Sequence, residues 1–203
     1  QLANKGNGNN FYIDSMDAAQ KIFSDQLAST LEVAAKDTKL QVEFDPAMVS
    51  RYRLVGYENR TIADDDFRKD HVDAGEIGVG HQVTALYVVD LTDQAKANPG
   101  PLAMVRIRHK APDGDVAAES TYAMTTSPAA SFDTASPDLR FAYTVAAFAD
   151  VLRGAEDAQK WSLDRIANAA RDTAGGDRDR TELVTLIEKA ARLRGTPLAV
   201  IAR

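Results

Sequence analysis

The sequence predicts an α+β protein in three parts: a strand and a helix over residues 1–36, an antiparallel β-sandwich over 37–130, and a three-helix subdomain over 131–203. Three observations carry this prediction. The apolar period changes from helical to alternating near residue 39, short alternating runs are then separated by turn residues, and a helical period returns after a polar, proline-containing linker at 127–137.

The first part begins with "FYID" at residues 11–14, which we expect to form a short strand. Asp14 or Ser15 is a suitable N-cap for the helix that follows. The apolar face of that helix consists of residues spaced three or four apart, namely Ala19, Ile22, Phe23, Leu27 and Leu31.

The middle part opens with "KLQVEFD", residues 39–45, in which Leu40, Val42 and Phe44 alternate with polar residues. This alternation is typical of a strand with one face in water. We expect further strands, each bounded by turn residues, at 50–59, 81–91, 102–110 and 116–125. Together these strands predict the sandwich.

The last part contains three helical patterns, at residues 138–153, about 161–173 and about 180–194. The first is apolar around most of its circumference. Because two short helices cannot cover it completely, we expect this subdomain to dock on the sandwich. Trp161, at a helix start, is interpreted as a packing anchor.

Composition excludes several classes of function. A chain of 203 residues that is 44% hydrophobic can bury a core, and the absence of cysteine excludes disulfides, thiolate metal sites and cysteine nucleophiles. A net charge of -6 disfavours nucleic-acid binding. The longest apolar run is much shorter than the roughly 20 residues of a membrane span, so we expect no membrane insertion by this segment.

The glycines at 75, 78 and 80 raise the question of a phosphate-binding loop. Such a loop needs glycines that open a helix, whereas these precede an alternating run and match neither G-x-G-x-x-G nor the P-loop spacing. We therefore interpret them as turn or bulge glycines that admit positive φ.

The preceding segment, "IADDDFRKDHVDAGE", is rich in carboxylates, which suggests a calcium loop. The EF-hand register fails, because Lys69 stands at the sixth position, where glycine is needed, and Gly75 at the twelfth. A solvated acidic loop is the simpler interpretation, and an irregular cation site is the alternative.

Two readings remain for the residues on either side of this loop. A structural or binding clasp would join "YENR" (Tyr57, Glu58, Asn59, Arg60) to Asp73, Glu76 and His81 of "DAGEIGVGH", with Arg60 holding Glu76. The alternative is a hydrolase or small-ligand enzyme with an acidic site around Glu58, Glu76 and His81. No catalytic residue is assigned by the first reading, and neither reading assigns a metal ligand.

Three stretches carry a resemblance to a known family: "GNGNNFYIDSMDAAQKIFSDQLASTLEVAAKDTKLQVEFDPAMVSRYRLVGYENR", "DAGEIGVGHQVTALY" and "SPDLRFAYTVAAFADVLRG". They resemble the C-terminal region of bacterial proteins in which a von Willebrand factor type A domain precedes a C-terminal domain of unknown function. The resemblance covers most of the chain.

That resemblance implies that residues 1–36 are the last strand and helix of the A domain. The adhesion-site motif Asp-x-Ser-x-Ser is not found in this sequence, so a divalent cation would belong to the part of the A domain that lies outside it. It also implies a non-enzymatic adhesion or scaffold protein with protein partners. The expected location is the cell envelope or periplasm, with a lipid anchor on an upstream segment.

Overall fold

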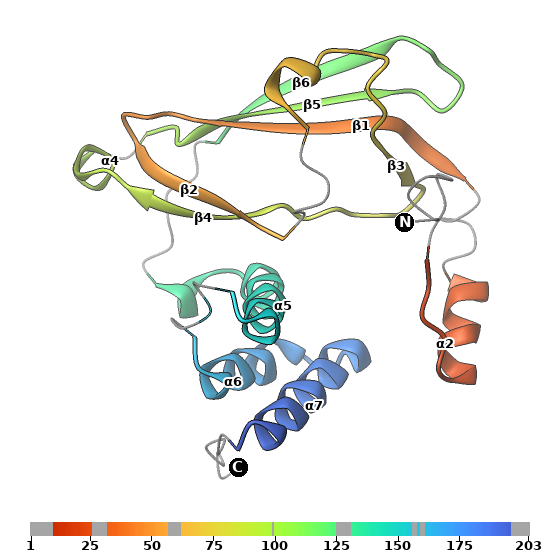
Figure 1. The fold of residues 1–203 in the computed structure, drawn as a ribbon, viewed down its shortest axis with the longest axis vertical. Helices are drawn as coiled ribbons and strands as arrows, with labels where there is room; N and C mark the ends of the chain where they lie inside the picture. The colour runs from red at the N-terminus through yellow and green to blue at the C-terminus, as the bar shows by residue number, and fades with distance from the viewer. Residues whose placement is uncertain are drawn as a thin grey trace. The chain divides into compact units, whose positions relative to one another are not determined.

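The structure is a computed structural model that describes residues 10–25, 32–56, 62–98, 100–124, 131–155, 158 and 161–195. It is α+β, with antiparallel sheets and five α-helices in these described ranges. The chain divides into two compact units, Gln1–Ser127 and Pro128–Arg203. Figure 1 draws the elements of both units.

The first unit contains a four-stranded antiparallel sheet in the order β3-β1-β5-β6. Its strands are β1 (Val33–Phe44), β3 (Gly75–Gly78), β5 (Ala103–Lys110) and β6 (Ala117–Met124). Residues that face each other across antiparallel strands share a face of the sheet. Val42 pairs with Val105, which pairs with Tyr122, whereas Arg108 pairs with Lys39 on one side and with Glu119 on the other. The sheet therefore has one apolar face and one charged face.

A second, two-stranded sheet joins β2 (Val49–Val55) to β4 (Leu86–Leu91). The Phe44 ring of β1 lies 4.5 Å from the ring of Tyr52 and 5.3 Å from that of Tyr87, measured between centroids. The apolar face of the larger sheet thus meets the smaller sheet at Phe44. The antiparallel sheets are as expected; their closure into a sandwich stays a prediction.

Several boundaries differ from expectation. The strand expected from residue 39 begins at Val33, so the expected domain boundary between residues 36 and 37 falls inside β1. Residues 11–14 form no strand. The strand expected over 81–91 begins only at Leu86, and "DQAKA" forms a short helix, α4 (Asp93–Ala97), capped by the Thr92 side chain.

The glycine-containing segment also differs from expectation, because Gly75 and Gly78 lie within strand β3. Only Gly80 adopts positive φ, at 80°, in the turn that follows. Gly80 is therefore a turn glycine, as expected, whereas Gly75 and Gly78 are strand residues without positive φ, next to the register shifts in the pairing with β1. Pairing with β1 supplies the backbone hydrogen bonds that make this segment a strand.

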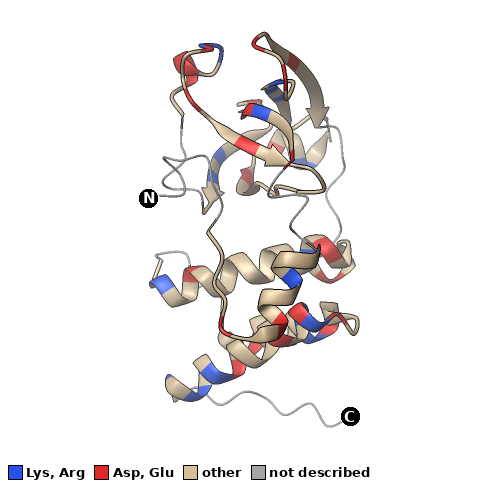
Figure 2. Ribbon diagram, turned by 90° about the vertical axis from the view of Figure 1, so that its right-hand side faces the viewer, with Lys and Arg blue, Asp and Glu red and all other residues tan. Residues whose placement is uncertain are grey.

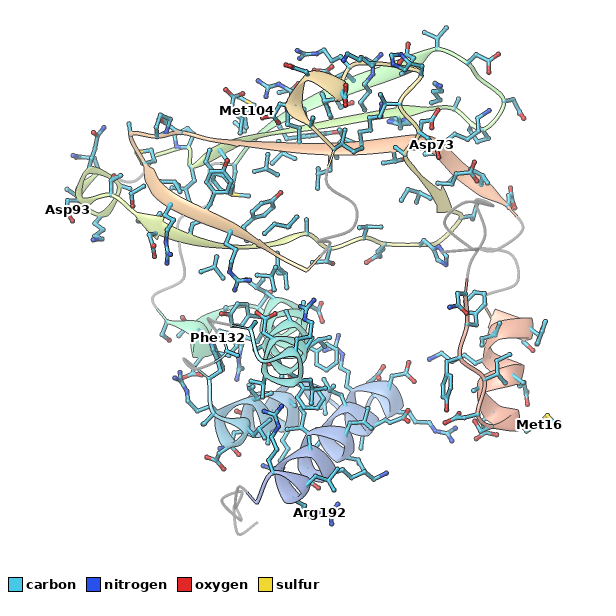
Figure 3. The ribbon with its side chains drawn as sticks, in the orientation of Figure 1. Met16, Asp73, Asp93, Met104, Phe132 and Arg192 are labelled. Carbon is cyan, nitrogen blue, oxygen red and sulfur yellow. The ribbon has the colours of Figure 1, made fainter. Side chains whose placement is uncertain are left out.

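The N-terminal helix is short and exposed. Helix α2 (Met16–Gln20) starts at Ser15, whose side chain accepts a bond from the Ala18 N–H, and it continues as a π-helix over Lys21–Asp25. None of the residues of α2 is buried, and Met16 is 82% exposed (Figure 3). Residues 26–31, where the expected helix would continue, lie outside the described ranges.

The second unit contains the three expected helices: α5 (Pro137–Arg153), α6 (Leu163–Ala174) and α7 (Arg178–Leu193). Their ends differ from the sequence prediction by less than one turn. The side chains of Ser136, Ser162 and Asp177 accept the N-cap bonds, which explains where each helix starts.

The core of this unit lies between the helices. Small and branched side chains fill it, and those with no exposed surface are Ile166, Ala167, Ala170, Ile187 and Ala191. Basic and acidic residues are interspersed along the helices (Figure 2). On α5, Leu139, Val145 and Leu152 are 50%, 41% and 52% exposed. The expected docking of this subdomain on the sandwich stays a prediction.

Trp161 belongs to the core of the helical unit. It packs against the buried cluster, and its ring lies 5.2 Å from the ring of Tyr143 and 5.5 Å from that of Phe132. The Arg165 guanidinium stacks over the indole at 4.8 Å. Trp161 is therefore a packing anchor, as the sequence predicts.

Candidate functional site

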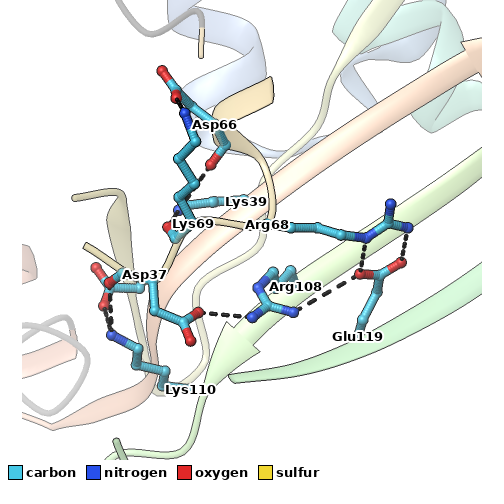
Figure 4. A network of polar contacts seen from close by, with 9 residues as sticks. Asp37, Lys39, Asp66, Arg68, Lys69, Arg108, Lys110 and Glu119 are labelled. Carbon is cyan, nitrogen blue, oxygen red and sulfur yellow. Dashed lines mark hydrogen bonds and ion pairs between the residues drawn. The ribbon is translucent and has the colours of Figure 1, made fainter. Parts of the chain in front are cut away.

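The charged face of the larger sheet is covered by the segment 62–74, which connects the two sheets. We call the side chains that hold it the polar clasp: Asp37, Lys39, Arg108, Lys110 and Glu119 of the sheet with Asp66, Arg68, Lys69 and Asp70 of the segment. Figure 4 shows these contacts from close by.

Lys39 is the most deeply placed member of the clasp. It is only 3% exposed, and its Nζ donates to the backbone carbonyl oxygens of Lys69 at 2.6 Å and Asp66 at 3.4 Å. An ammonium group can be buried at low cost only when hydrogen bonds replace its water. The segment supplies those bonds, and in return Lys39 fixes the segment to β1.

Asp37 owes its position to an irregularity of β1. The pairing of β1 with β5 changes register between Lys36 and Lys39, and Asp37 adopts φ 48°, a left-handed conformation that aspartate tolerates better than most residues. Its Oδ2 accepts from Lys110 Nζ at 2.6 Å, and its Oδ1 accepts from the Ala74 N–H at 3.3 Å. The bulge therefore joins β1 to β5 and to the end of the segment.

Two further contacts attach the segment to β6 and β5. Arg68 donates to both oxygens of Glu119, from Nε at 3.0 Å and from Nη2 at 2.8 Å, and Arg108 donates to Asp70 at 2.7 Å. The two-point geometry of the first pair matches a guanidinium to a carboxylate. The segment is thus attached to β1, β5 and β6 together.

An aromatic side chain completes the attachment. Phe67, in the middle of the segment, is 4% exposed. It follows a short 3-10 helix over Asp64–Asp66, where Asp64 accepts a bond from Gln41 of β1. Burial of a phenylalanine stabilises by roughly 1.5 to 3 kcal/mol relative to exposure, so Phe67 adds an apolar contribution to the charged contacts.

The clasp carboxylates are held in the ionised form. The hydrogen bond from Lys110 lowers the pKa of Asp37, with burial acting in the opposite direction. Likewise, the bond from Arg108 lowers the pKa of Asp70, and the bond from Arg68 lowers the pKa of Glu119. Near neutral pH these groups therefore act as hydrogen-bond acceptors for cations rather than as proton donors.

Three of the residues that the sequence singled out lie in or next to strand β3 and the turn after it. Asp73 lies just before β3 and is exposed (Figure 3), Glu76 is exposed on β3, and the His81 N–H donates to the carbonyl oxygen of Gly78 at 3.0 Å. Tyr57, Glu58, Asn59 and Arg60 lie outside the described residues. The pair between Arg60 and Glu76 therefore stays a prediction, and so does the convergence of Glu58 with Glu76 and His81.

Sequence reasoning missed the clasp residues on the strands. One signal was available: Lys39 alternates with the apolar residues of β1, and Arg106, Arg108 and Lys110 alternate in the same way on β5. Basic residues on one face of two strands, with an acidic segment in the same chain, indicate that this segment covers the face.

The structure also bears on metal binding and on membrane insertion. Among the described residues, no group of three or more histidines and carboxylates is placed to hold a metal ion. Within the same ranges, no helix combines the length and the apolar character that crossing a bilayer requires.

Comparison with known proteins places the chain in a family. The family model described as the C-terminal part of the uncharacterized protein YfbK matches residues 29–193, which is most of the chain. The chain belongs to the YfbK C-terminal family. The uncharacterized protein YfbK of Escherichia coli (strain K12) is 35% identical over 208 residues, which cover 94% of this chain and 36% of that protein. No solved structure matches.

The YfbK C-terminal match includes the polar clasp and all three helices of the second unit. It begins shortly before β1 at Val33 and ends at the last residue of α7, Leu193. Helix α2, Met16–Gln20, lies ahead of the matched range. The clasp residues therefore lie within the part of the chain that matches the family.

Proposed function

We propose that this chain is a non-enzymatic protein interaction or scaffold module of a cell-envelope protein that also carries a von Willebrand factor type A domain. The observation that carries the proposal is the polar clasp, whose ionised carboxylates are each bonded to a cation. Groups engaged in this way hold a segment in one shape. A rigid, mixed-charge surface is suited to protein recognition.

The finer architecture is part of the same proposal. Phe44, which contacts aromatic rings of the smaller sheet, supports a sandwich as the arrangement of the two sheets. For the segment before β1, we propose the end of an A domain. Its support is the resemblance of the sequence, the start of the family match at residue 29, and the lack of buried residues in α2.

The resemblance also supports the cellular context. A divalent cation would belong to the A domain, outside these residues, and the location would be the cell envelope or periplasm, with a lipid anchor on an upstream segment. The partners would be proteins, which the module would hold for adhesion or assembly.

The interaction role is tested by crosslinking the tagged chain in bacterial envelope fractions and comparing wild type with Lys39→Met and Lys36→Met. Lys39 anchors segment 62–74, whereas Lys36 lies on the same strand and serves as the matched control. We expect wild type and Lys36→Met to capture the same discrete protein in stoichiometric yield, and Lys39→Met to lose it. Equal capture by all three chains would contradict a role for the clasp.

The enzyme alternative has its own test. Wild type and Glu76→Gln are assayed against chromogenic ester, phosphoester and peptide substrates. We expect no turnover that depends on Glu76. Measurable hydrolysis that disappears in Glu76→Gln, with the thermal unfolding of the chain unchanged, would replace the scaffold proposal by the hydrolase.

A further inference from the structure

The two edges of the larger sheet differ in how well they are protected against pairing with another strand. Strand β3, at one edge, has only four residues, two of them glycines, and its pairing with β1 contains register shifts. Shortness and irregular pairing are common devices that prevent an edge from accepting another strand. Strand β6, at the other edge, has eight residues and pairs with β5 without a register shift.

Strand β6 lacks the usual protective residues. Its sequence, AAESTYAM, contains no proline and no lysine. Its one charged residue, Glu119, points to the charged face of the sheet and is bonded to Arg68 and Arg108. In the described part of the chain, the backbone of β6 bonds only to β5 and to Leu102 beside it, so these contacts leave its outer edge available.

The side chains of β6 are arranged for pairing with themselves. On the apolar face, the small residues Ala118 and Ser120 come first, and the large residues Tyr122 and Met124 follow. Tyr122 is 57% exposed and Met124 is 40% exposed. In an antiparallel pair of identical strands centred on Thr121, Tyr122 faces Ser120 and Met124 faces Ala118. Each large side chain then lies beside a small one.

The charged face permits the same pairing. With Thr121 at the centre, each threonine faces its counterpart, a favourable cross-strand combination. Glu119 faces Ala123, so the two glutamates do not oppose each other. A parallel arrangement would instead place Tyr122 against Tyr122 and Glu119 against Glu119.

We propose that β6 is a self-association edge: two copies of this chain join their β6 strands antiparallel about Thr121, which makes one eight-stranded sheet across the pair. The partner is a second copy, because the sequence of β6 is complementary to its own reverse in size and places no like charges opposite each other. This inference deepens the proposed scaffold function and rests on it, since joining two copies would present two partner-binding surfaces.

The test uses a charge placed at the two-fold axis. Thr121→Lys and Thr121→Glu each bring two like charges face to face in a homodimer, whereas a mixture of the two brings opposite charges together. Sedimentation velocity of the whole chain over a concentration series measures the association. We expect wild type to dimerise, each variant alone to weaken the dimer by about tenfold or more, and the mixture to recover most of the loss.

Val116→Lys is the matched control, because Val116 is 85% exposed and lies in the same hairpin, just before the strand. It should dimerise like wild type.

A wild-type chain that stays monomeric at all concentrations would overturn the inference and leave the edge to a strand of another protein. A dimer that both Thr121 variants leave intact would overturn it too. Envelope capture that depends on Lys39 would survive either result, so failure here is distinguishable from failure of the proposed function.

Discussion

The two units of this protein are stabilised by different interactions. In the helical unit, Ile166, Ala170 and Ile187 have no exposed surface and form part of one continuous apolar cluster. In the β unit, the buried apolar cluster consists of Met48, Val49 and Ala95, and a lysine is as buried as any of them. The helical unit is a packed core, whereas the β unit depends on charged contacts across one face of its sheet.

This difference has consequences for how each unit responds to its surroundings. Apolar burial changes little with pH and is strengthened by salts such as sulfate. Ion pairs near the surface weaken as the ionic strength rises or as their carboxylates are protonated. The β unit should therefore be the sensitive part of the molecule, and the helical unit the insensitive part.

We expect the largest loss of stability from a single substitution in the helical unit. Phe148 of α5 is 7% exposed within the apolar cluster, and Phe148→Ala removes its ring and leaves a cavity. We expect a loss of about 3 to 5 kcal/mol in the free energy of unfolding. Denaturant unfolding followed by the fluorescence of Trp161, the one tryptophan of the chain, measures it. A loss below about 1 kcal/mol would contradict a tightly packed core.

A smaller effect is expected from Lys39→Met in the β unit. This change removes the hydrogen bonds from the Lys39 ammonium to the carbonyl oxygens of Asp66 and Lys69, which keep their backbone donors from Lys69 and Val72. Because a hydrogen bond of a charged group contributes roughly 1.5 to 3 kcal/mol, we expect a loss of about that size. Thermal unfolding measured alongside Lys36→Met checks it. If both lysine variants matched wild type, the clasp would contribute nothing to stability.

Acid should destabilise the β unit more than the helical unit, and we expect this effect to be smaller than that of Lys39→Met. The pKa values of Asp37, Asp70 and Glu119 are lower in the folded protein than in the unfolded chain, so the unfolded chain binds more protons as the pH falls. Their stabilisation is complete above the unfolded pKa values, near 4, and is lost as the pH falls through the lower folded values. Circular dichroism and Trp161 fluorescence recorded from pH 7 to pH 2 should diverge, with strand structure lost before the fluorescence changes. If the circular dichroism and fluorescence signals changed at the same pH, the β unit would not be the more acid-sensitive of the two.

The smallest effect concerns the pair predicted between Arg60 and Glu76. Because Glu76 is exposed on β3, an ion pair there is worth less than about 1 kcal/mol. Glu76→Gln and Asp65→Asn should therefore both lower the melting temperature only slightly. A Glu76→Gln effect as large as that of Lys39→Met would mean that the clasp extends to this pair.

The helices were predictable from local sequence. Apolar residues at helical spacing, together with N-caps at Ser136, Ser162 and Asp177, determine where α5, α6 and α7 lie. Strand positions followed from alternation in the same way. Strand β3 was missed because "GEIG" has no alternating pattern and its glycines disfavour a strand, which forms only by pairing with the distant β1.

The clasp was not predictable because its contacts join residues far apart in the sequence. Lys39 bonds to a segment 27 to 30 residues away, and Asp37 bonds to Lys110, 73 residues away. The position of Asp37 also depends on a bulge that the residue pattern does not reveal. Sequence reasoning chose Glu76 for its charge and for the freedom of Gly75 and Gly78 beside it. Within the clasp, strand register decides which charges meet.

Hydrogen–deuterium exchange of wild type and Lys39→Met at one pH tests most directly whether the clasp holds the β unit while the core holds the helical unit. We predict that amides in β1 and segment 62–74 lose protection in the variant and that amides in α5, α6 and α7 exchange as in wild type. Unchanged protection in segment 62–74, or an equal loss in both units, would contradict this account.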